Sequence, residues 1–203
     1  AEYCIKQFGI DSNAPLVDIG CGEGFISKYF FDRGYRISAA DFSIHGIRDR
    51  NPELLNKIEF IQCDITSKDL FFSKRKFPII ICRGVMEHVR DINALVDNFN
   101  SLISHSGILV IYVPNDRGPL INRYRKRIGK GFTDCLPFCP PEHIRYFTHN
   151  SLEKLMKRHG FKRRFSRMAT LPVEAFLLSD STDYYSHKEK GKTVHDIRCQ
   201  FAE

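Results

Sequence analysis

The segment "PLVDIGCGEGF", Pro15 to Phe25, constrains the fold more than any other part of the chain. A short apolar run, typical of a buried strand, leads directly into three glycines at alternate positions, with Asp18 just before them. Glycine lets the backbone turn tightly and lets a ligand approach without meeting a Cβ atom. The segment therefore predicts a strand, a ligand-binding loop and the start of a helix, in that order.

Strand and helix patterns alternate along the chain after this point. The expected strands cover 15–20, 35–41, 58–64, 77–82 and 107–114, with a sixth at 161–171. The expected helices cover 24–35, 44–57, 91–104 and 148–161, and the second is expected to be interrupted near Pro52. This order predicts an α/β fold with a doubly wound, Rossmann-like sheet of mostly parallel strands. The 203 residues suit one domain, 1–203, in which 115–142 forms an irregular basic insertion. The tail 181–203 gives no assignable pattern.

The cysteines and the charge set the expected environment. Seven cysteines are scattered without paired spacing, which is typical of reduced thiols in a cytoplasmic protein. No signal-peptide pattern or membrane-spanning apolar run is visible. The net charge is +7, and five Lys or Arg residues fall within 122–131 without an acid. Such a cluster contacts phosphate, nucleic acid or a membrane surface, or else forms a solvated loop.

Acidic residues mark the ends of the first three expected strands. Ligands of such sheets bind beyond the carboxyl ends of the strands, where Asp18, Asp41 and Asp64 are expected. A dinucleotide would need G-x-G-x-x-G, but the run from Gly22 has Ser27 in the last position. The alternative is a nucleoside ligand, whose ribose hydroxyls and adenine amine donate to carboxylates at strands two and three. Asp18 could in addition hold an ammonium group of the ligand. A ligand that combines adenine, ribose and an amino-acid tail is S-adenosylmethionine.

Five segments in this order resemble the class I S-adenosylmethionine-dependent methyltransferases: "VDIGCGEG", "AADFS", "QCDI", "IICRGVMEHV" and "GILVIYVPN". The later "PPEHIRYFTHNSLEKLMKRHGF" resembles a branch that includes small-molecule, lipid-quinone and sugar methyltransferases. The resemblance covers roughly residues 14 to 165. It implies S-adenosylmethionine as the cofactor, S-adenosylhomocysteine as the product, and a seventh, antiparallel last strand that the C-terminal tail would have to supply.

The resemblance also assigns cofactor contacts to particular positions. The residues that would contact the methionine part or the cofactor around it are Asp18, Gly20, Cys21, Gly22 and Gly24. Asp41 would bind the ribose, Phe42 would pack beside the adenine, and Asp64 and the backbone at Ile65 would contact the adenine. Arg83 would lie beside the transferred methyl group, at a position where the family often has a small or polar residue.

Methyl transfer is an in-line displacement, so alignment of the reacting atoms supplies much of the rate. A base is needed only where the acceptor loses a proton, as a hydroxyl does. The candidate catalytic residues are His88, His143 and Arg83, and a structural role is the alternative for each histidine. Some relatives bind a divalent ion through Glu-x-x-Glu-His. Glu87, His88 and His143 suggest such a metal site here, but Gly84 occupies the first position of the motif and supplies no ligand, so we expect no metal.

The resulting hypothesis is a methyltransferase acting on a small-molecule or lipid-linked acceptor, at oxygen. The acceptor is expected to be acidic or to lie at a membrane surface reached by 122–131. Nucleic acid is disfavoured because the "NPPY"-type tetrad of DNA methyltransferases is absent and the basic cluster offers little aromatic surface beyond Tyr124. The alternatives are an NAD-dependent oxidoreductase, a non-catalytic S-adenosylmethionine-binding module and, less favoured, an RNA methyltransferase. Oligomeric state leaves no signal in the sequence.

Overall fold

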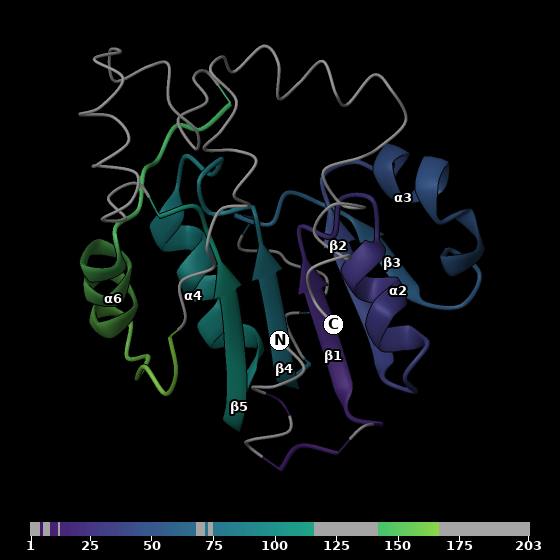
Figure 1. Ribbon diagram of the computed structural model, residues 1–203, viewed down its shortest axis with the longest axis horizontal. Helices are drawn as coiled ribbons and strands as arrows, with labels where there is room; N and C mark the ends of the chain where they lie inside the picture. Colours follow the sequence, from purple (N-terminus) through teal and green to yellow (C-terminus); the bar gives the residue numbers. More distant parts are fainter. Residues whose placement is uncertain are drawn as a thin grey trace, which may run out of the picture.

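The protein forms a parallel five-stranded sheet with the strand order β3-β2-β1-β4-β5 (Figure 1). The computed structural model describes residues 5, 9–11, 13–67, 72, 75–115 and 142–166. The strands are β1 Pro15–Ile19, β2 Arg36–Asp41, β3 Glu59–Gln62, β4 Phe77–Arg83 and β5 Ile103–Tyr112. Every strand pair in this part of the chain is parallel. The predicted α/β, Rossmann-like class is therefore confirmed.

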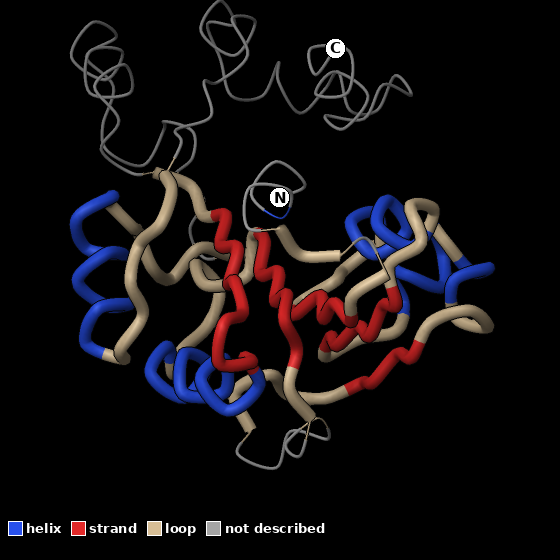
Figure 2. Tube along the Cα trace, turned by 90° about the horizontal axis from the view of Figure 1, so that it is seen from below, coloured by secondary structure: helices blue, strands red, loops and turns tan. Residues whose placement is uncertain are grey.

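Helices cover both faces of this sheet (Figures 1 and 2). They are α2 Phe25–Phe31, α3 His45–Arg50, the 3₁₀ turn η1 Pro52–Leu54, α4 Ile92–Leu102 and α6 His149–Arg158. Successive residues of a strand point to opposite faces, so β1 sends Leu16 to one core and Val17 to the other. The core that contains Leu16 is closed by α2, α3 and η1.

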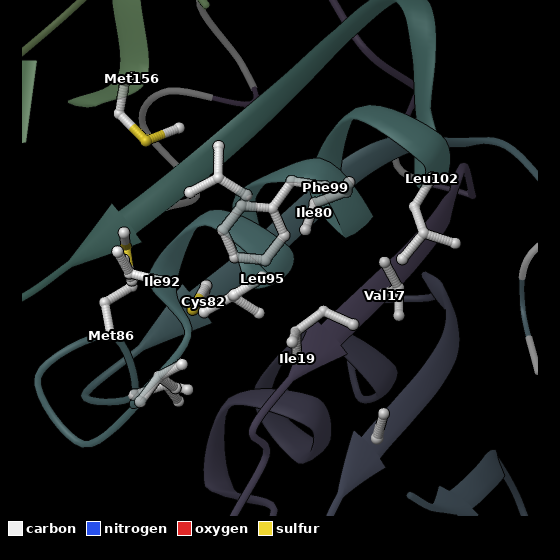
Figure 3. Packing of buried hydrophobic residues seen from close by; sticks show 14 of the residues in the cluster. Val17, Ile19, Ile80, Cys82, Met86, Ile92, Leu95, Phe99, Leu102 and Met156 are labelled. Carbon is white, nitrogen blue, oxygen red and sulfur yellow. The ribbon is translucent and has the colours of Figure 1, made fainter. Parts of the chain in front are cut away.

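The second core lies between the sheet and α4 (Figure 3). Leu95 and Phe99 of α4 are fully buried against Val17 and Ile80 of the central strands. Met156 of α6 extends the same cluster, so α6 is held against α4 and β5 by apolar contact. The two long helices close the face of the sheet opposite α2 and α3.

Side-chain caps fix where the two longest helices begin. The Asp91 carboxylate accepts a hydrogen bond from the Ala94 amide at 3.0 Å, as expected for an N-cap aspartate. Thr148 rather than Asn150 caps α6, because Thr148 and Ser151 exchange side-chain to backbone hydrogen bonds in a capping box.

The helix expected at 44–57 is interrupted near Pro52 as predicted, since Asn51 takes a non-helical conformation immediately before Pro52. Two other predicted boundaries are wrong. Strand β3 ends at Gln62, so Asp64 lies in the following loop and does not end the strand. Strand β5 begins at Ile103, because Ile103 pairs with Phe77 before a register irregularity.

Other expected elements are absent or lie outside the described residues. No strand forms over 161–166, and 167–171 lie outside the described residues. The insertion at 116–141 and the tail that would supply the antiparallel last strand also lie outside them. Within the described part of the chain, no helix has the length and apolar character needed to cross a membrane.

Glycines shape the turn from β1 into α2. Gly20, Gly22 and Gly24 all have positive φ, at 74°, 53° and 77°. A Cβ atom on Gly20 would lie 2.2 Å from the Val85 side chain, and one on Gly24 would lie 2.8 Å from Ile47. A Cβ on Gly22 would meet nothing within 4 Å. Gly20 and Gly24 therefore serve packing, and Gly22 leaves space beside the loop.

This difference can be tested with two alanine variants. Gly20→Ala and Gly22→Ala both place an L residue at positive φ, which costs roughly 1–2 kcal/mol. Gly20→Ala also forces the stiff Val85 side chain away and should lose about 1–3 kcal/mol more in the free energy of unfolding. Urea denaturation measures both values, and equal losses in the two variants would contradict the packing role of Gly20.

Candidate active site

A cavity opens at the carboxyl ends of β1 and β4, where the strand order reverses. In such sheets this switch point is the usual ligand site. The cavity has a volume of about 120 Å³. Its lining residues are Asp18, Gly20, Cys21, Glu23, Phe25, Ile26 and Arg83. Ligand pockets commonly measure about 300–1,000 Å³, so this cavity has room for one end of a nucleoside-sized ligand.

Asp18 is the buried acid of this cavity. Only 2% of the residue is exposed, and its Oδ2 accepts a hydrogen bond from the Ser27 hydroxyl at 2.7 Å. Burial raises the pKa of Asp18 to about 6, and the hydrogen bond from Ser27 and the nearby Arg83 guanidinium partly oppose that rise. The group is thus mostly ionised at neutral pH although its side chain is almost fully shielded from solvent, which favours a cationic ligand group.

Asp41 fastens the glycine loop, residues 20–24, to the end of β2. Its Oδ2 accepts from the Gly22 amide at 2.8 Å, and its Oδ1 accepts from the Ser43 amide at 3.1 Å. The Gly20 and Cys21 amides both donate to the carbonyl of the residue before Asp41, at 2.7 and 3.2 Å. Each carboxylate oxygen keeps a further lone pair, so Asp41 retains acceptor capacity for a ligand.

The residues expected around an adenine lie beyond the cavity, after β2 and β3. Phe42 is 78% exposed, the highest value among the large apolar side chains of the described residues. Asp64 is exposed, and its hydrogen bonds from the Thr66 hydroxyl and amide lower its pKa. The Ile65 carbonyl accepts from the Asn98 side chain at 2.8 Å, which fixes this loop to α4.

The predicted cofactor residues thus divide into two groups. The cavity gathers Asp18, Gly20, Cys21 and Arg83. Those outside its lining are Gly22, Gly24, Asp41, Phe42, Asp64 and Ile65. Burial strongly raises the pKa of the Cys21 thiol, so this side chain is a packing group rather than a nucleophile.

A second polar cluster forms where the loop after β4 meets the segment 142–147. The amides of Ile144 and Arg145 both donate to the Glu87 carbonyl at 3.0 Å. The Arg145 side chain donates to the Val89 carbonyl at 2.7 Å. These contacts join two segments that lie more than fifty positions apart and bring the two predicted catalytic histidines together.

The His88 and His143 rings meet edge to face, with their centroids 4.8 Å apart and an interplanar angle of 68°. His88 Nδ1 lies 2.7 Å from the Glu142 carbonyl. A carbonyl only accepts, so we infer that Nδ1 carries the hydrogen and that Nε2 of the neutral ring is an acceptor. Both rings lie beside the Glu87 carboxyl group, since ligand atoms of the three side chains fall within 4.8 Å of one another.

Glu87 is the buried member of this cluster. The residue is 3% exposed, and burial raises the pKa of its carboxyl group. Its Oε2 atom has no hydrogen-bond partner among the described residues. The three side chains could hold a metal ion, but Gly84 adds no ligand to them. Sequence reasoning gave Glu87 no role outside a metal site.

Sequence reasoning also missed Ser27 as the partner of Asp18. Ser27 is completely buried on the first turn of α2, in a helix that otherwise buries apolar side chains. A serine on the apolar face of a helix that follows a glycine loop is the signal that could have identified it. The contact itself joins a strand to a helix, so no local periodicity encodes it.

The pKa of Asp18 predicts a specific pH dependence of stability. The ordinary pKa is 3.8, so between that value and about 6 the folded state binds more protons than the unfolded state. The stability due to neutral Asp18 is therefore lost as the pH rises through this interval. Relative to Asp18→Asn, the wild-type free energy of unfolding should fall by about 2 kcal/mol between about pH 4.5 and pH 7. Denaturant titrations of both proteins measure this difference, and parallel pH profiles would contradict it.

Comparison with known proteins agrees with this geometry. A family model described as a methyltransferase domain matches residues 4–164. The ubiquinone biosynthesis O-methyltransferase of Pelagibacter ubique is 31% identical over 121 residues, which cover 56% of this chain and 50% of the relative. The chain therefore spans about half the length of the curated relatives it matches.

Solved structures show the same fold at low sequence identity. YcgJ of Bacillus subtilis aligns with a TM-score of 0.63 and 15% identity, over 98% of this chain and 86% of its own. The 1,6-didemethyltoxoflavin-N1-methyltransferase of Burkholderia thailandensis aligns with a TM-score of 0.59 and 19% identity, over 82% of this chain and 67% of its own. That structure contains S-adenosylhomocysteine. Because the family model covers most of the sequence, this chain belongs to the methyltransferase-domain family.

Proposed function

We propose that this protein transfers a methyl group from S-adenosylmethionine to an oxygen of a small-molecule or lipid-linked acceptor. The carrying observation is the pair of buried carboxylates, Asp18 and Asp41, on either side of the glycine loop at the switch point of a methyltransferase-family sheet. The two acids match the ammonium and the ribose of a cofactor that has no phosphate groups.

The cofactor would lie along the carboxyl edge of the sheet. In this arrangement Asp18 faces its ammonium in the cavity, the glycine loop including Cys21 lines the methionine part, and Asp41 accepts from the ribose. Phe42 packs on the adenine, and its large exposed fraction supports that role. Asp64 and the backbone at Ile65 would contact the adenine edge.

The same carboxylates disfavour the NAD-dependent alternative. A pyrophosphate over the glycine loop would lie near Asp41, which hydrogen-bonds the loop, and near Asp18 in the cavity beneath it. Two negative groups beside a doubly charged ligand are repulsive in a poorly hydrated site. Ser27 also gives its hydroxyl to Asp18, where the dinucleotide fingerprint has a glycine for close helix packing.

Oxygen is the proposed acceptor atom because a hydroxyl needs a base and the second cluster offers one. His88 would accept the proton at Nε2, with His143 and Glu87 beside it. The Pelagibacter relative carries the name of an O-methyltransferase, which supports the choice of atom. We propose that no metal takes part.

The remaining features of the proposal concern the segment 115–142. Asn115 forms an isolated parallel bridge with Phe147, which supports a role for the intervening insertion at the acceptor site of a single domain, 1–203. The net charge of +7, with its cluster at 122–131, supports an acidic acceptor or a membrane-surface contact. Free thiols at Cys21, Cys63 and Cys82 support a cytoplasmic location.

Calorimetric titration with S-adenosylhomocysteine tests the cofactor, with NAD as the parallel ligand. We expect S-adenosylhomocysteine to bind and NAD not to bind. Asp41→Ala should weaken binding at least about tenfold, because a hydrogen bond to a charged group contributes roughly 1.5–3 kcal/mol. Asp32→Ala, which removes an exposed acid paired with Lys28, is the matched control. If the protein binds NAD instead, or binds neither ligand, the proposal is wrong.

A panel of phenols and catechols, offered with S-adenosylmethionine, tests the base. For any acceptor that is methylated, His88→Gln should lower kcat about 100-fold, because general-base catalysis commonly contributes about 10²–10⁴-fold. The Kd for S-adenosylhomocysteine should stay unchanged, which separates a chemical role from a structural one. An unchanged kcat would remove His88 from the mechanism.

Chelation tests the absence of a metal in the same assay. Turnover should survive dialysis against EDTA, since the cluster has a glycine where a further carboxylate ligand would stand. Loss of turnover that Mg²⁺ or Mn²⁺ restores would instead assign a metal to Glu87, His88 and His143.

A further inference from the structure

Two opposite charges share the cavity and project from the same face of the sheet. Asp18 of β1 pairs with Ile81 of β4 in the strand register. Arg83 lies two residues beyond Ile81, and side chains two apart point to the same face. Both Asp18 and Arg83 line the cavity, next to Phe25 and Ile26 of α2.

The Arg83 guanidinium is held by stacking and not by an ion pair. It lies over the Tyr112 ring at 5.5 Å from the centroid, and Tyr112 is its neighbour across the β4–β5 pairing. Asp18 feels its charge, but the two groups form no salt bridge, and Asp18 accepts from Ser27 instead. Within the described residues, no carbonyl or carboxylate accepts a hydrogen bond from Arg83.

A half-buried guanidinium without an acceptor in the described part of the chain has a clear chemical preference. It carries five N–H donors in a planar fork that matches a carboxylate, and stacking on an aromatic ring leaves the edge of that fork free. An ammonium fits Asp18 for the same electrostatic reason. The cavity therefore presents a buried carboxylate and a guanidinium that form no salt bridge with each other, which is the complement of an α-amino acid. Glu23, the other acid of the lining, pairs with Arg50 at 3.5 Å.

We infer that Arg83 binds the α-carboxylate of the cofactor's amino-acid end, while Asp18 faces the α-ammonium. This inference rests on the proposed function and gives Arg83 a positioning role: it anchors the end of the cofactor remote from the adenine. An acidic acceptor is the other possible source of a carboxylate, and the experiment below distinguishes the two.

Removing the carboxylate from the ligand and the guanidinium from the protein forms a thermodynamic cycle. S-adenosylmethionine and decarboxylated S-adenosylmethionine, which keeps the amine and the sulfonium, are titrated into wild type and Arg83→Met. Arg83→Met should weaken S-adenosylmethionine roughly 10- to 100-fold, as expected for hydrogen bonds between charged groups. Binding of the decarboxylated ligand should change by less than about twofold, the usual limit for independent sites. Arg83→Lys should restore part of the loss, because it keeps the charge without the fork.

Arg33→Met provides a matched control. Arg33 also stacks on a tyrosine, with its guanidinium 3.6 Å from the centroid of the Tyr29 ring, but it follows the carboxyl end of α2 and does not line the cavity. The variant removes the same charge and the same kind of stacking contact, and the Kd for both ligands should stay unchanged. Thermal unfolding of each variant checks that the fold is retained.

Three results would overturn the inference. Unchanged binding of S-adenosylmethionine to Arg83→Met would show that Arg83 does not contact the cofactor. Equal weakening of both ligands would mean that Arg83 shapes the cavity without contacting the carboxylate. The third result concerns acceptors that bind to the protein saturated with S-adenosylhomocysteine. In it, Arg83→Met binds the cofactor unchanged and binds catechol unchanged, but binds 3,4-dihydroxybenzoate, which carries a carboxylate, more weakly than wild type does. That result would assign Arg83 to the acceptor. If wild type binds neither cofactor form, the proposed function itself fails.

Discussion

The candidate site depends on the hydrogen bonds that hold the glycine loop against the end of β2. The Asp41 carboxylate and the carbonyl before it accept from three consecutive amides of the loop, at Gly20, Cys21 and Gly22. Those amides would otherwise lack partners in a turn where the backbone has left the sheet ladder. Because the loop is fixed, Asp18 and Ser27 meet beneath it, and the cavity has a defined wall. The same carboxylate that stabilises the turn is thus the group proposed to bind the ribose.

Much of this edge of the sheet could be predicted, because it follows from local patterns. A buried strand followed by glycines identified the loop, and strand alternation set Asp18 and Asp41 at one edge. The end of β3 could not be predicted, since the segment "IEFIQCD" has no glycine, proline or other stop signal after Gln62. Gln62 pairs with Asp41, the last residue of β2, so Asp64 has no strand residue to pair with. The end of β3 is therefore set by the length of β2, and the sequence of β3 alone contains no information about that length.

The cluster of Glu87, His88 and His143 likewise depends on contacts between distant segments, which a local sequence pattern does not predict. Each histidine was recognisable from its own motif, but their approach depends on the amides of Ile144 and Arg145 reaching the Glu87 carbonyl. Such long-range backbone contacts have no periodicity. The burial of Glu87 with an unpartnered Oε2 follows from this docking, because the segment 142–147 covers the loop after β4. A carboxyl group whose pKa is raised beside two imidazoles makes this region electrostatically different from the cavity around Asp18.

The bridge between Asn115 and Phe147 has an evolutionary consequence. It joins a residue that follows β5 to a residue just before α6, so the two residues that flank 116–146 lie side by side. Lengthening a loop whose ends are already joined adds little entropic cost, about 0.6 kcal/mol for each doubling of its length. The segment proposed to contribute to the acceptor site can therefore change in length during evolution at little cost to the stability of the fold.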